Sequence, residues 1–313
     1  MNAPAPDRLD DPFFIVGAPR SGTTLVQAII SSHSRMHVPA ETEFFMKFIP
    51  PDAATQDEST WQAYVERWLG SMPFQEQGLD ATAFRERLQT IDRTTRGVFL
   101  ALLAEHARAT GKPRIGEKSP HHCRHIDAML MALPEVKIIH VYRDPRDVVA
   151  SRLRVPWTHA SHRHLANSWR KDLERHLRCL SSLPNDRYMG LQLEALILQP
   201  EEETRCLCSF LGETYEPGML AFHERKDAGF TDREAAWKSG TRKPLDPNAI
   251  GRYRETLSNR QVHDIQVIAG PLMEQLGYAH DSIRPGLLWP MLGMLDAVRD
   301  RAHRLRHSVR KRL

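Results

Sequence analysis

The sequence predicts a three-layer α/β/α protein with a central parallel sheet. Residues 13–16, Phe-Phe-Ile-Val, form an apolar strand that runs through a glycine-bounded loop into a helix over residues 25–30. Residues 136–142 form a second apolar strand, and Asp144 and Pro145 behind it are favourable residues for the start of a helix. Repeated strand-to-helix units are typical of parallel sheets that helices cover on both faces.

Size and composition indicate one soluble globular domain. The chain has 313 residues, of which 41% are hydrophobic and 26% charged, enough to bury one large core. The N-terminus lacks an apolar signal core, and no apolar run approaches the roughly 20 residues that span a bilayer. We therefore expect a cytoplasmic protein. The four cysteines match neither zinc-site nor disulfide-framework spacing, so we expect reduced, mostly buried thiols.

The basic charge of the chain is concentrated at its C-terminal end. Residues 284–313 hold eight Lys or Arg and two Asp, a net charge of +6, so residues 1–283 carry −2 of the total of +4. Nucleic-acid binding requires a basic patch on the fold itself, preferably with stacking aromatic residues. The body of the chain shows no such pattern, and nucleic acid is not an expected partner.

The loop after the first strand has the composition of an anion-binding site. Gly17 and Gly22 enclose four residues, and a helix follows directly, so backbone N–H groups and the positive end of the helix converge on one point. A nucleotide-binding P-loop carries Lys after its second glycine, whereas Thr23 stands there and Arg20 supplies the cation inside the loop. A strand-to-helix turn whose glycines serve only tight packing is the structural alternative.

Next along the chain come a loop carboxylate and a helical region. Glu41 lies in a polar segment after the first helix, where a carboxylate is either solvated or able to act as a general base. Residues 55–110 predict helices, and we interpret residues 52–110, approximately, as a helical insert that covers an acceptor site. Apolar residues at helical spacing predict its buried face: Trp61, Tyr64, Val65, Trp68 and Leu69.

Lys118 follows a short strand-like segment. Ligands of open α/β sheets collect at strand ends, so a cation here can reach a transferring group; a solvated lysine is the alternative. The nearby His121, His122, Cys123 and His125 point in different directions on a helix, which disfavours a metal site. Arg143 stands just before the next predicted helix, and Ser151 lies about two turns into it.

Together these motifs resemble those of sulfotransferases that use 3'-phosphoadenosine 5'-phosphosulfate (PAPS), most closely the tyrosylprotein type. Residues 19–24, Pro-Arg-Ser-Gly-Thr-Thr, resemble the 5'-phosphosulfate loop of that family. Arg143 and Ser151 have the spacing of the residues that bind the 3'-phosphate, an oxyanion suited to a guanidinium and a hydroxyl. The resemblance spans about residues 12–270 and implies a P-loop-like sulfotransferase domain, residues 1–283, without a metal.

The resemblance also implies the role of individual residues. Glu41 with Thr42 matches the family's Glu-Thr pair, which implies a general base, and Lys118 matches a Lys-x-Pro site whose lysine stabilises the transferring group. Arg20 would stabilise the same charge. The cofactor-binding residues that it implies are Arg20, Ser21, Gly22, Thr23, Thr24, Arg143, Ser151 and Lys243.

Some positions depart from the family pattern. Glu43 replaces a basic residue, and Leu193 and Ala195 replace the Tyr and Asp of a Tyr-Glu-Asp-Leu strand expected over residues 188–196. Residues 225–254 predict an irregular basic loop. The resemblance implies that Lys243, or Arg242 beside it, closes on the 3'-phosphate; ordinary surface charge is the alternative.

The tail, residues 284–313, lies outside the resemblance. Residues 287–295 are apolar and the following residues are rich in Arg, a pattern typical of an amphipathic basic helix. Such a helix would contact an anionic membrane surface through residues 287–313, which would place the protein at the inner face of the membrane. The alternatives are a helix docked on the body or one that forms a homodimer.

We therefore predict sulfuryl transfer from PAPS to an acceptor hydroxyl of a carbohydrate, a lipid head group, a peptide tyrosine or a small alcohol. One alternative is a P-loop kinase-like phosphotransferase, which the missing P-loop lysine and the lack of a strand-end Asp for Mg²⁺ disfavour. The other is a non-catalytic nucleotide-binding scaffold at a membrane surface.

Overall fold

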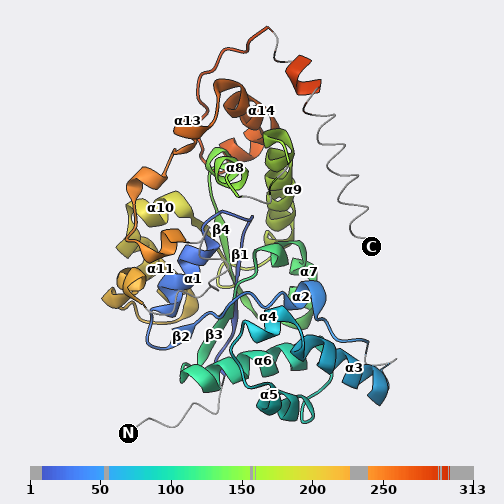
Figure 1. Ribbon diagram of the computed structural model, residues 1–313. Coiled ribbons are helices and arrows are strands. Elements are labelled where there is room, and N and C mark those ends of the chain that lie inside the picture. The colour runs from blue at the N-terminus through green and yellow to red at the C-terminus, as the bar shows by residue number, and fades with distance from the viewer. Residues whose placement is uncertain are drawn as a thin grey trace.

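Five parallel strands form the centre of the molecule (Figure 1). The computed structural model describes residues 9–52, 56–155, 158, 160–225 and 239–287, together with 289, 291–294 and 296. The sheet order is β2-β3-β1-β4-β5. The strands are β1 (Phe13–Val16), β2 (Met36–His37), β3 (Arg114–Glu117), β4 (Lys137–Tyr142) and β5 (Tyr188–Gln192). The predicted parallel sheet is confirmed.

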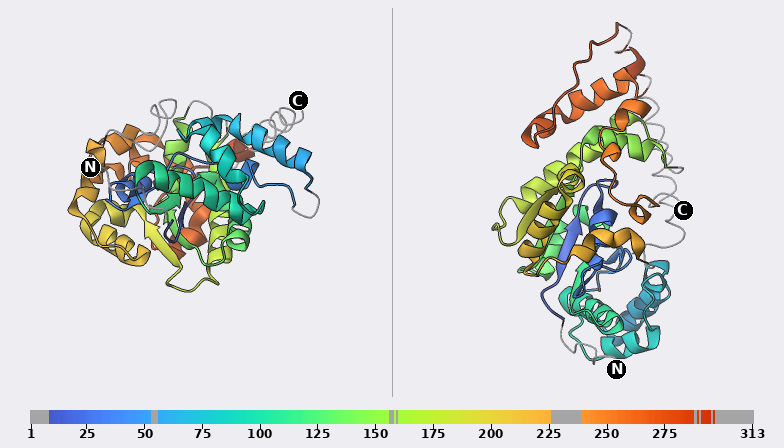
Figure 2. Two further views of the ribbon diagram at one scale, coloured as in Figure 1. Left: turned by 90° about the horizontal axis from the view of Figure 1, so that it is seen from below. Right: turned by 90° about the vertical axis from the view of Figure 1, so that its left-hand side faces the viewer.

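Helices cover both faces of the sheet, as Figure 2 shows. Successive side chains of a strand point to opposite faces, so the four apolar residues of β1 serve both layers. Phe13 and Ile15 pack in one core cluster, and Phe14 and Val16 in another. The first cluster includes residues of α1 (Thr23–Ser31) and α11 (Pro200–Leu211), and the second residues of α7 (Ile126–Ala132) and α9 (His162–Leu180).

The helical insert forms the lower end of the molecule in Figure 1. It consists of α3 (Glu58–Leu69), α4 (Met72–Gln75), α5 (Ala81–Leu88) and α6 (Thr95–Thr110). A polar side chain caps each helix by accepting a backbone N–H: Asp57, Ser71, Asp80 and Thr94, respectively. Trp61 and Trp68 are each 1% exposed, so the aromatic face is packed in the core, as predicted.

At the other end of the molecule, α8 (Pro145–Leu153) and α14 (Asn259–Gln275) pack on α9. Asp144 caps α8 by accepting the Arg146 N–H at 2.8 Å, and Pro145 occupies the first helical position, as the sequence predicts. Other short helices among the described residues are α2 (Phe44–Lys47), α10 (Leu193–Leu198), α13 (Tyr253–Thr256), η1 (Pro120–Arg124), η2 (Pro217–Glu224), η4 (Ser239–Arg242) and η5 (Pro247–Ala249).

Two sequence expectations are wrong. The strand expected over residues 188–196 ends at Gln192, and α10 begins at the next residue. Glu194 in its first turn is buried and accepts hydrogen bonds from the Asp144 N–H and the Tyr278 hydroxyl, both at 3.0 Å, contacts that a continued strand would not provide. The thiols are not mostly buried, because Cys206 is exposed and Cys179 only half-buried.

Among the described helices, none combines the length and apolar character of a bilayer span.

Two imidazoles are buried together between the sheet and α9. His140 of β4 and His176 of α9 approach to 2.9 Å between Nε2 and Nδ1, and His140 Nδ1 lies 3.2 Å from the Tyr188 hydroxyl. Burial lowers the pKa of His140 well below its ordinary value and the pKa of His176 to about 4. Both rings are therefore neutral in the folded protein near neutral pH.

This pair predicts loss of stability in mild acid. Between about pH 6.5 and 4 the unfolded histidines take up protons that the buried ones do not, so the free energy of unfolding falls as pH falls. The slope is about 1.4 kcal/mol per pH unit for each proton taken up. Urea unfolding at several pH values measures it.

His176→Gln is expected to reduce this slope, because it removes one of the two groups, whatever it does to stability at pH 7.5. The exposed His280 provides the control, and His280→Gln is expected to keep the wild-type slope. Identical slopes in wild type and His176→Gln would contradict the assignment.

Candidate active site

The predicted site residues meet at one edge of the sheet. Strands β3, β1 and β4 are neighbours, with Phe14 in register with Glu117 and Val16 with His140. Because these strands are parallel, their carboxyl ends lie at the same edge, where ligands of such sheets bind. Gly17, Lys118 and Arg143 are the first residues after β1, β3 and β4, respectively.

The loop after β1 is shaped by its two glycines. At Gly17 a Cβ atom would lie 2.4 Å from the carbonyl oxygen of Val141. Gly22 has φ 97°, in the left-handed region, and a Cβ there would lie 2.5 Å from Leu193 Cδ1. Arg20 also has a positive φ, of 75°. The loop therefore packs against β4 and α10 in a conformation that larger residues at the glycine positions would prevent.

Several properties of this loop fit a phosphate or sulfate group. The Ser21 hydroxyl is buried and, within the described part of the chain, has no hydrogen-bond partner. Gly22 provides no side-chain cap for α1, and the first-turn N–H groups of a helix have no partners inside the helix. The predicted Thr23 and Thr24 form that first turn. Buried donors of this kind are satisfied by an anion's oxygens.

Arg20 connects this loop to the second predicted motif. Its Nε donates to Ser151 Oγ at 3.0 Å, across 131 residues of sequence. Burial lowers the pKa of Arg20, and the charges of Arg143 and Arg154 lower it further. Guanidinium groups that repel one another here favour a bound anion, which would balance their charge. Sequence reasoning missed Arg154, which lies three residues beyond Ser151.

Lys118 and Glu41 form an ion pair. Their Nζ and Oε1 atoms are 2.7 Å apart, and the side chain of Lys118 is fully buried while that of Glu41 is 21% exposed. The backbone carbonyl of Glu41 also accepts a hydrogen bond from Gln77, just after α4, at 3.3 Å. The structure thus joins two residues that the sequence separates by 77 positions. An accessible carboxylate can take up a proton from a bound hydroxyl. The buried ammonium group beside it can stabilise negative charge that develops on a ligand.

The late basic loop approaches Arg143 through its backbone. Arg143 Nη2 donates to the carbonyl of Ala249 at 3.0 Å, and Asp147 accepts the N–H groups of Gly251 and Tyr253 at 2.8 and 2.9 Å. Sequence analysis missed this anchoring function of Asp147. Lys243 follows η4 and is exposed, so its contact with a 3'-phosphate stays a prediction. Residues 226–238 of this loop lie outside the described residues.

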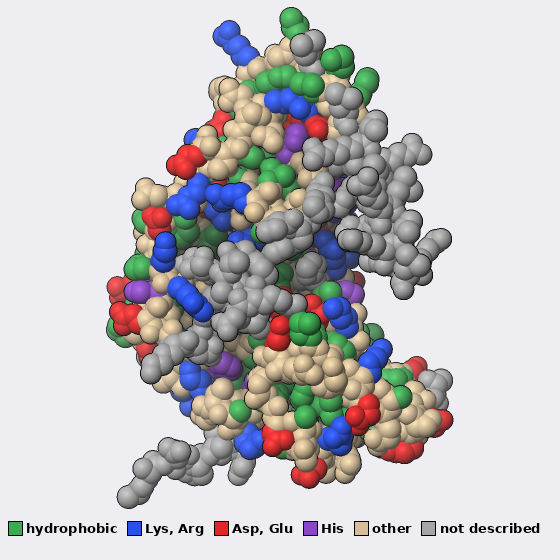
Figure 3. Space-filling view, viewed as in Figure 1, with side chains coloured by type: hydrophobic (Ala, Val, Ile, Leu, Met, Phe, Trp, Pro, Cys, Tyr) green, Lys and Arg blue, Asp and Glu red, His purple; other side chains and the backbone are tan. Residues whose placement is uncertain are grey.

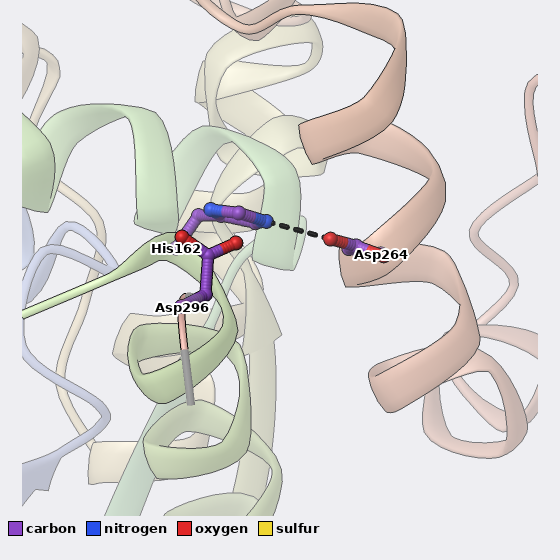
Figure 4. Close-up of side chains that lie close together, drawn as sticks. All are labelled: His162, Asp264 and Asp296. Carbon is purple, nitrogen blue, oxygen red and sulfur yellow. Dashed lines mark hydrogen bonds and ion pairs between the residues drawn. The ribbon is translucent and has the colours of Figure 1, made fainter. Parts of the chain in front are cut away.

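One cluster of potential metal ligands occurs among the described residues, and it includes none of the predicted site residues. His162, Asp264 and Asp296 have ligand atoms within 4.8 Å of one another (Figure 4). His162 Nε2 lies 2.8 Å from Asp264 Oδ2, Arg163 Nη1 lies 2.8 Å from Asp264 Oδ1, and Arg260 pairs with Asp296. Because two guanidinium groups already balance the carboxylates, we interpret the cluster as an ion-pair network that joins α9, α14 and the tail.

The carboxyl edge of the parallel sheet thus carries a loop suited to an anion and a carboxylate–ammonium pair, the arrangement expected of an α/β transferase. A model of the sulfotransferase family matches residues 12–217. The chain therefore belongs to the sulfotransferase family, and the predicted family and enzyme class are confirmed.

Known proteins agree with this assignment. A putative protein-tyrosine sulfotransferase of Caenorhabditis briggsae is 24% identical over 280 residues, which cover 87% of this chain and 90% of the relative. Protein-tyrosine sulfotransferase 1 of Danio rerio is 25% identical over 297 residues, which cover 91% of this chain and 77% of the relative. The solved sulfotransferase domain of the Synechococcus PCC 7002 olefin synthase has a TM-score of 0.63 and 20% identity, over 90% of this chain and 100% of that one. This structural likeness shows the sulfotransferase fold.

Proposed function

We propose that this protein transfers a sulfuryl group from PAPS to an acceptor hydroxyl. The observation that carries the proposal is the 2.7 Å ion pair between Lys118 and Glu41 at the sheet edge that also bears the anion-binding loop. Such a pair supplies a base for the acceptor and a cation for the transferring group in one place. Family membership supports sulfuryl transfer as the reaction class.

Each part of the site has a task in this reaction. The loop N–H groups, Ser21 and Arg20 hold the 5'-phosphosulfate, and Arg143 and Ser151 hold the 3'-phosphate. Glu41 takes the acceptor's proton while the acceptor oxygen attacks sulfur in line. The bond between sulfur and the bridging oxygen breaks, and adenosine 3',5'-bisphosphate leaves. Lys118 and Arg20 stabilise the charge that develops on the leaving group.

The acceptor is a hydroxyl compound. The named relatives act on protein tyrosine, so a tyrosine peptide is the first acceptor to assay, ahead of a carbohydrate, a lipid head group and a small alcohol. Glu43, which replaces a basic residue of the tyrosylprotein type, forms an ion pair with Lys47. A second carboxylate close to Glu41 favours an acceptor that lacks acidic neighbours.

Binding of the product nucleotide is the first testable expectation. Adenosine 3',5'-bisphosphate is expected to raise the melting temperature saturably, because it binds only the folded protein, whereas ATP with Mg²⁺ has a weak effect. Arg143→Ala is expected to weaken this binding about 30-fold or more, through loss of a charge-assisted contact. Thermal-shift titration measures both.

Arg205→Ala is the control, because Arg205 is an exposed residue of α11 that pairs with Glu201 of the same helix and lies over the Tyr215 ring. It should bind the bisphosphate as the wild type does. Preference for ATP would support the kinase alternative, and equal binding by Arg143→Ala and the wild type would remove Arg143 from the site.

Turnover tests the base. Glu41→Gln is expected to lower kcat by about 10²- to 10⁴-fold and to leave bisphosphate binding intact, because the amide cannot take a proton from the acceptor. Release of bisphosphate from labelled PAPS measures the rate. Glu201→Gln is the control, because Glu201 is an exposed carboxylate that pairs with Arg205 of its own helix, and it should keep near-normal turnover. Bisphosphate binding without turnover in the wild type would favour the scaffold alternative.

We also propose that the protein is cytoplasmic and contacts an anionic membrane surface through residues 287–313. The described helical residues 289, 291–294 and 296 differ in their exposure. Trp289 packs on the His263 ring and Asp296 pairs with Arg260, so one side faces α14. Met291 and Met294, on the opposite side at about 100° per residue, are 56% and 71% exposed. Figure 3 shows hydrophobic side chains exposed at this end of the molecule.

Vesicle co-sedimentation tests the membrane proposal. We expect binding to vesicles with phosphatidylserine, little binding to phosphatidylcholine alone, and release by high salt, since eight Lys or Arg of the tail oppose two Asp. Met291→Ser with Met294→Ser should weaken binding. Leu198→Ser, at another exposed apolar residue (62% exposed), is the control. Equal sedimentation with both vesicle types, or none with either, would contradict the proposal.

A further inference from the structure

A buried carboxylate directly before Lys118 organises the segment that carries Glu41. Glu117 is the last residue of β3 and only 1% exposed. Its Oε1 accepts hydrogen bonds from the hydroxyls of Thr42 at 2.9 Å and Ser119 at 2.6 Å. Its Oε2 lies 2.8 Å from Nδ1 of His122. One carboxylate therefore contacts three side chains. Thr42 follows Glu41 in the sequence, and Ser119 and His122 follow Lys118.

Each of these three side chains also accepts one backbone N–H. The N–H groups of Glu43, Phe44 and Phe45 donate, in that order, to Ser119 Oγ, Thr42 Oγ1 and His122 Nε2, each at 3.2 Å. These N–H groups lie at the start of α2 (Phe44–Lys47), where a helix offers them no internal partner. Three parallel bridges thus connect the end of β3 to three consecutive backbone groups.

The pattern of donors defines the protonation of the network. The backbone N–H of Phe45 can only donate, so Nε2 of His122 accepts and its proton resides on Nδ1, which donates to Glu117. Burial raises the pKa of Glu117, but His122, Ser119 and Thr42 outweigh this effect and hold the pKa below its ordinary value. The network is complete with Glu117 ionised and His122 neutral.

The bridges hold a backbone conformation that is costly on its own. Glu43 has φ 51°, in the left-handed region that residues other than glycine rarely adopt. Glu41 lies one residue before Thr42, and Lys118 one residue after Glu117. A shift of the 42–45 backbone would therefore move the Glu41 carboxylate relative to Lys118 Nζ.

We propose that Glu117 and His122 are positioning residues, which act through the backbone of residues 43–45 to keep the Glu41 carboxylate at its position beside Lys118 Nζ. This inference rests on the proposed sulfuryl transfer. The hydrogen bonds described for Glu117 and His122 link them to Thr42, Ser119, each other and the Phe45 N–H. Loss of the bridges should therefore lower kcat while the nucleotide, which the loop and Arg143 hold, binds as before.

Two substitutions at His122 separate its two hydrogen bonds. Gln places its carbonyl oxygen near the position of Nε2 and can accept the Phe45 N–H, whereas Asn places its amide near Nδ1 and can only donate to Glu117. We expect His122→Asn to lower kcat by about 10²-fold, the effect of an ångström-scale displacement, and His122→Gln to stay within about tenfold of the wild type. The bisphosphate-induced thermal shift should stay at the wild-type value in both.

Thr42 gives an independent test with little change in volume. Thr42→Val removes the hydroxyl that links Glu117 to the Phe44 N–H and should reduce kcat at least tenfold, whereas Thr42→Ser keeps the hydroxyl and should restore most of it. A merely structural effect would lower the bisphosphate affinity of Thr42→Val together with kcat, whereas loss of positioning leaves that affinity unchanged. This pair keeps the proposal testable if His122→Asn does not fold.

The outcomes separate this inference from the function on which it rests. A wild type that binds PAPS but releases no bisphosphate with any acceptor overturns the proposed function and this inference together. An active wild type with equal kcat in Thr42→Val and His122→Asn overturns the inference alone. The inference is also overturned if kcat and bisphosphate affinity fall by the same factor in Thr42→Val or His122→Asn.

Discussion

The common direction of three neighbouring strands is the constraint on which the site depends. β3, β1 and β4 run parallel in register, so their carboxyl ends lie at one edge although residues 17, 118 and 143 are far apart in sequence. Beyond each strand end, the backbone N–H and C=O groups are no longer paired within the sheet, so they require other hydrogen-bond partners. The sheet, rather than contacts among themselves, therefore brings the loop after β1, Lys118 and Arg143 to one edge, where the proposed site lies.

The buried charged groups at this edge of the sheet differ in the charges that surround them. Lys118 is fully buried and paired with Glu41, and Glu117 beside it receives three hydrogen bonds. An unpaired buried charge would cost several kcal/mol, so these groups stabilise one another. The pKa of Arg20, in contrast, is lowered by burial and by other arginines. The surplus of positive charge lies at the loop, where an anionic donor would bind.

The sequence predicted the features that are encoded locally. The strand-loop-helix around Gly22 and the capped helix after Asp144 depend on neighbouring residues, and both are found. Contacts across long separations were not predictable: no local pattern relates Glu41 to Lys118, or Thr42 and His122 to Glu117. The same holds for residues 193–196, where contacts of Glu194 with Asp144 and Tyr278 favour a helix over the expected strand.

The ion pair between Glu41 and Lys118 is compatible with both of their tasks in the proposed reaction. An ammonium group has three N–H donors, and a carboxylate has about four acceptor positions, so their contact engages only part of each group's capacity. In the proposed reaction, Lys118 keeps its bond to Glu41 while another of its N–H groups turns to the leaving oxygen. The Glu41 side chain is 21% exposed, so an acceptor hydroxyl can approach its carboxylate. As Glu41 takes the proton, its attraction for Lys118 weakens and the ammonium charge is directed to the leaving group at the moment when negative charge develops there.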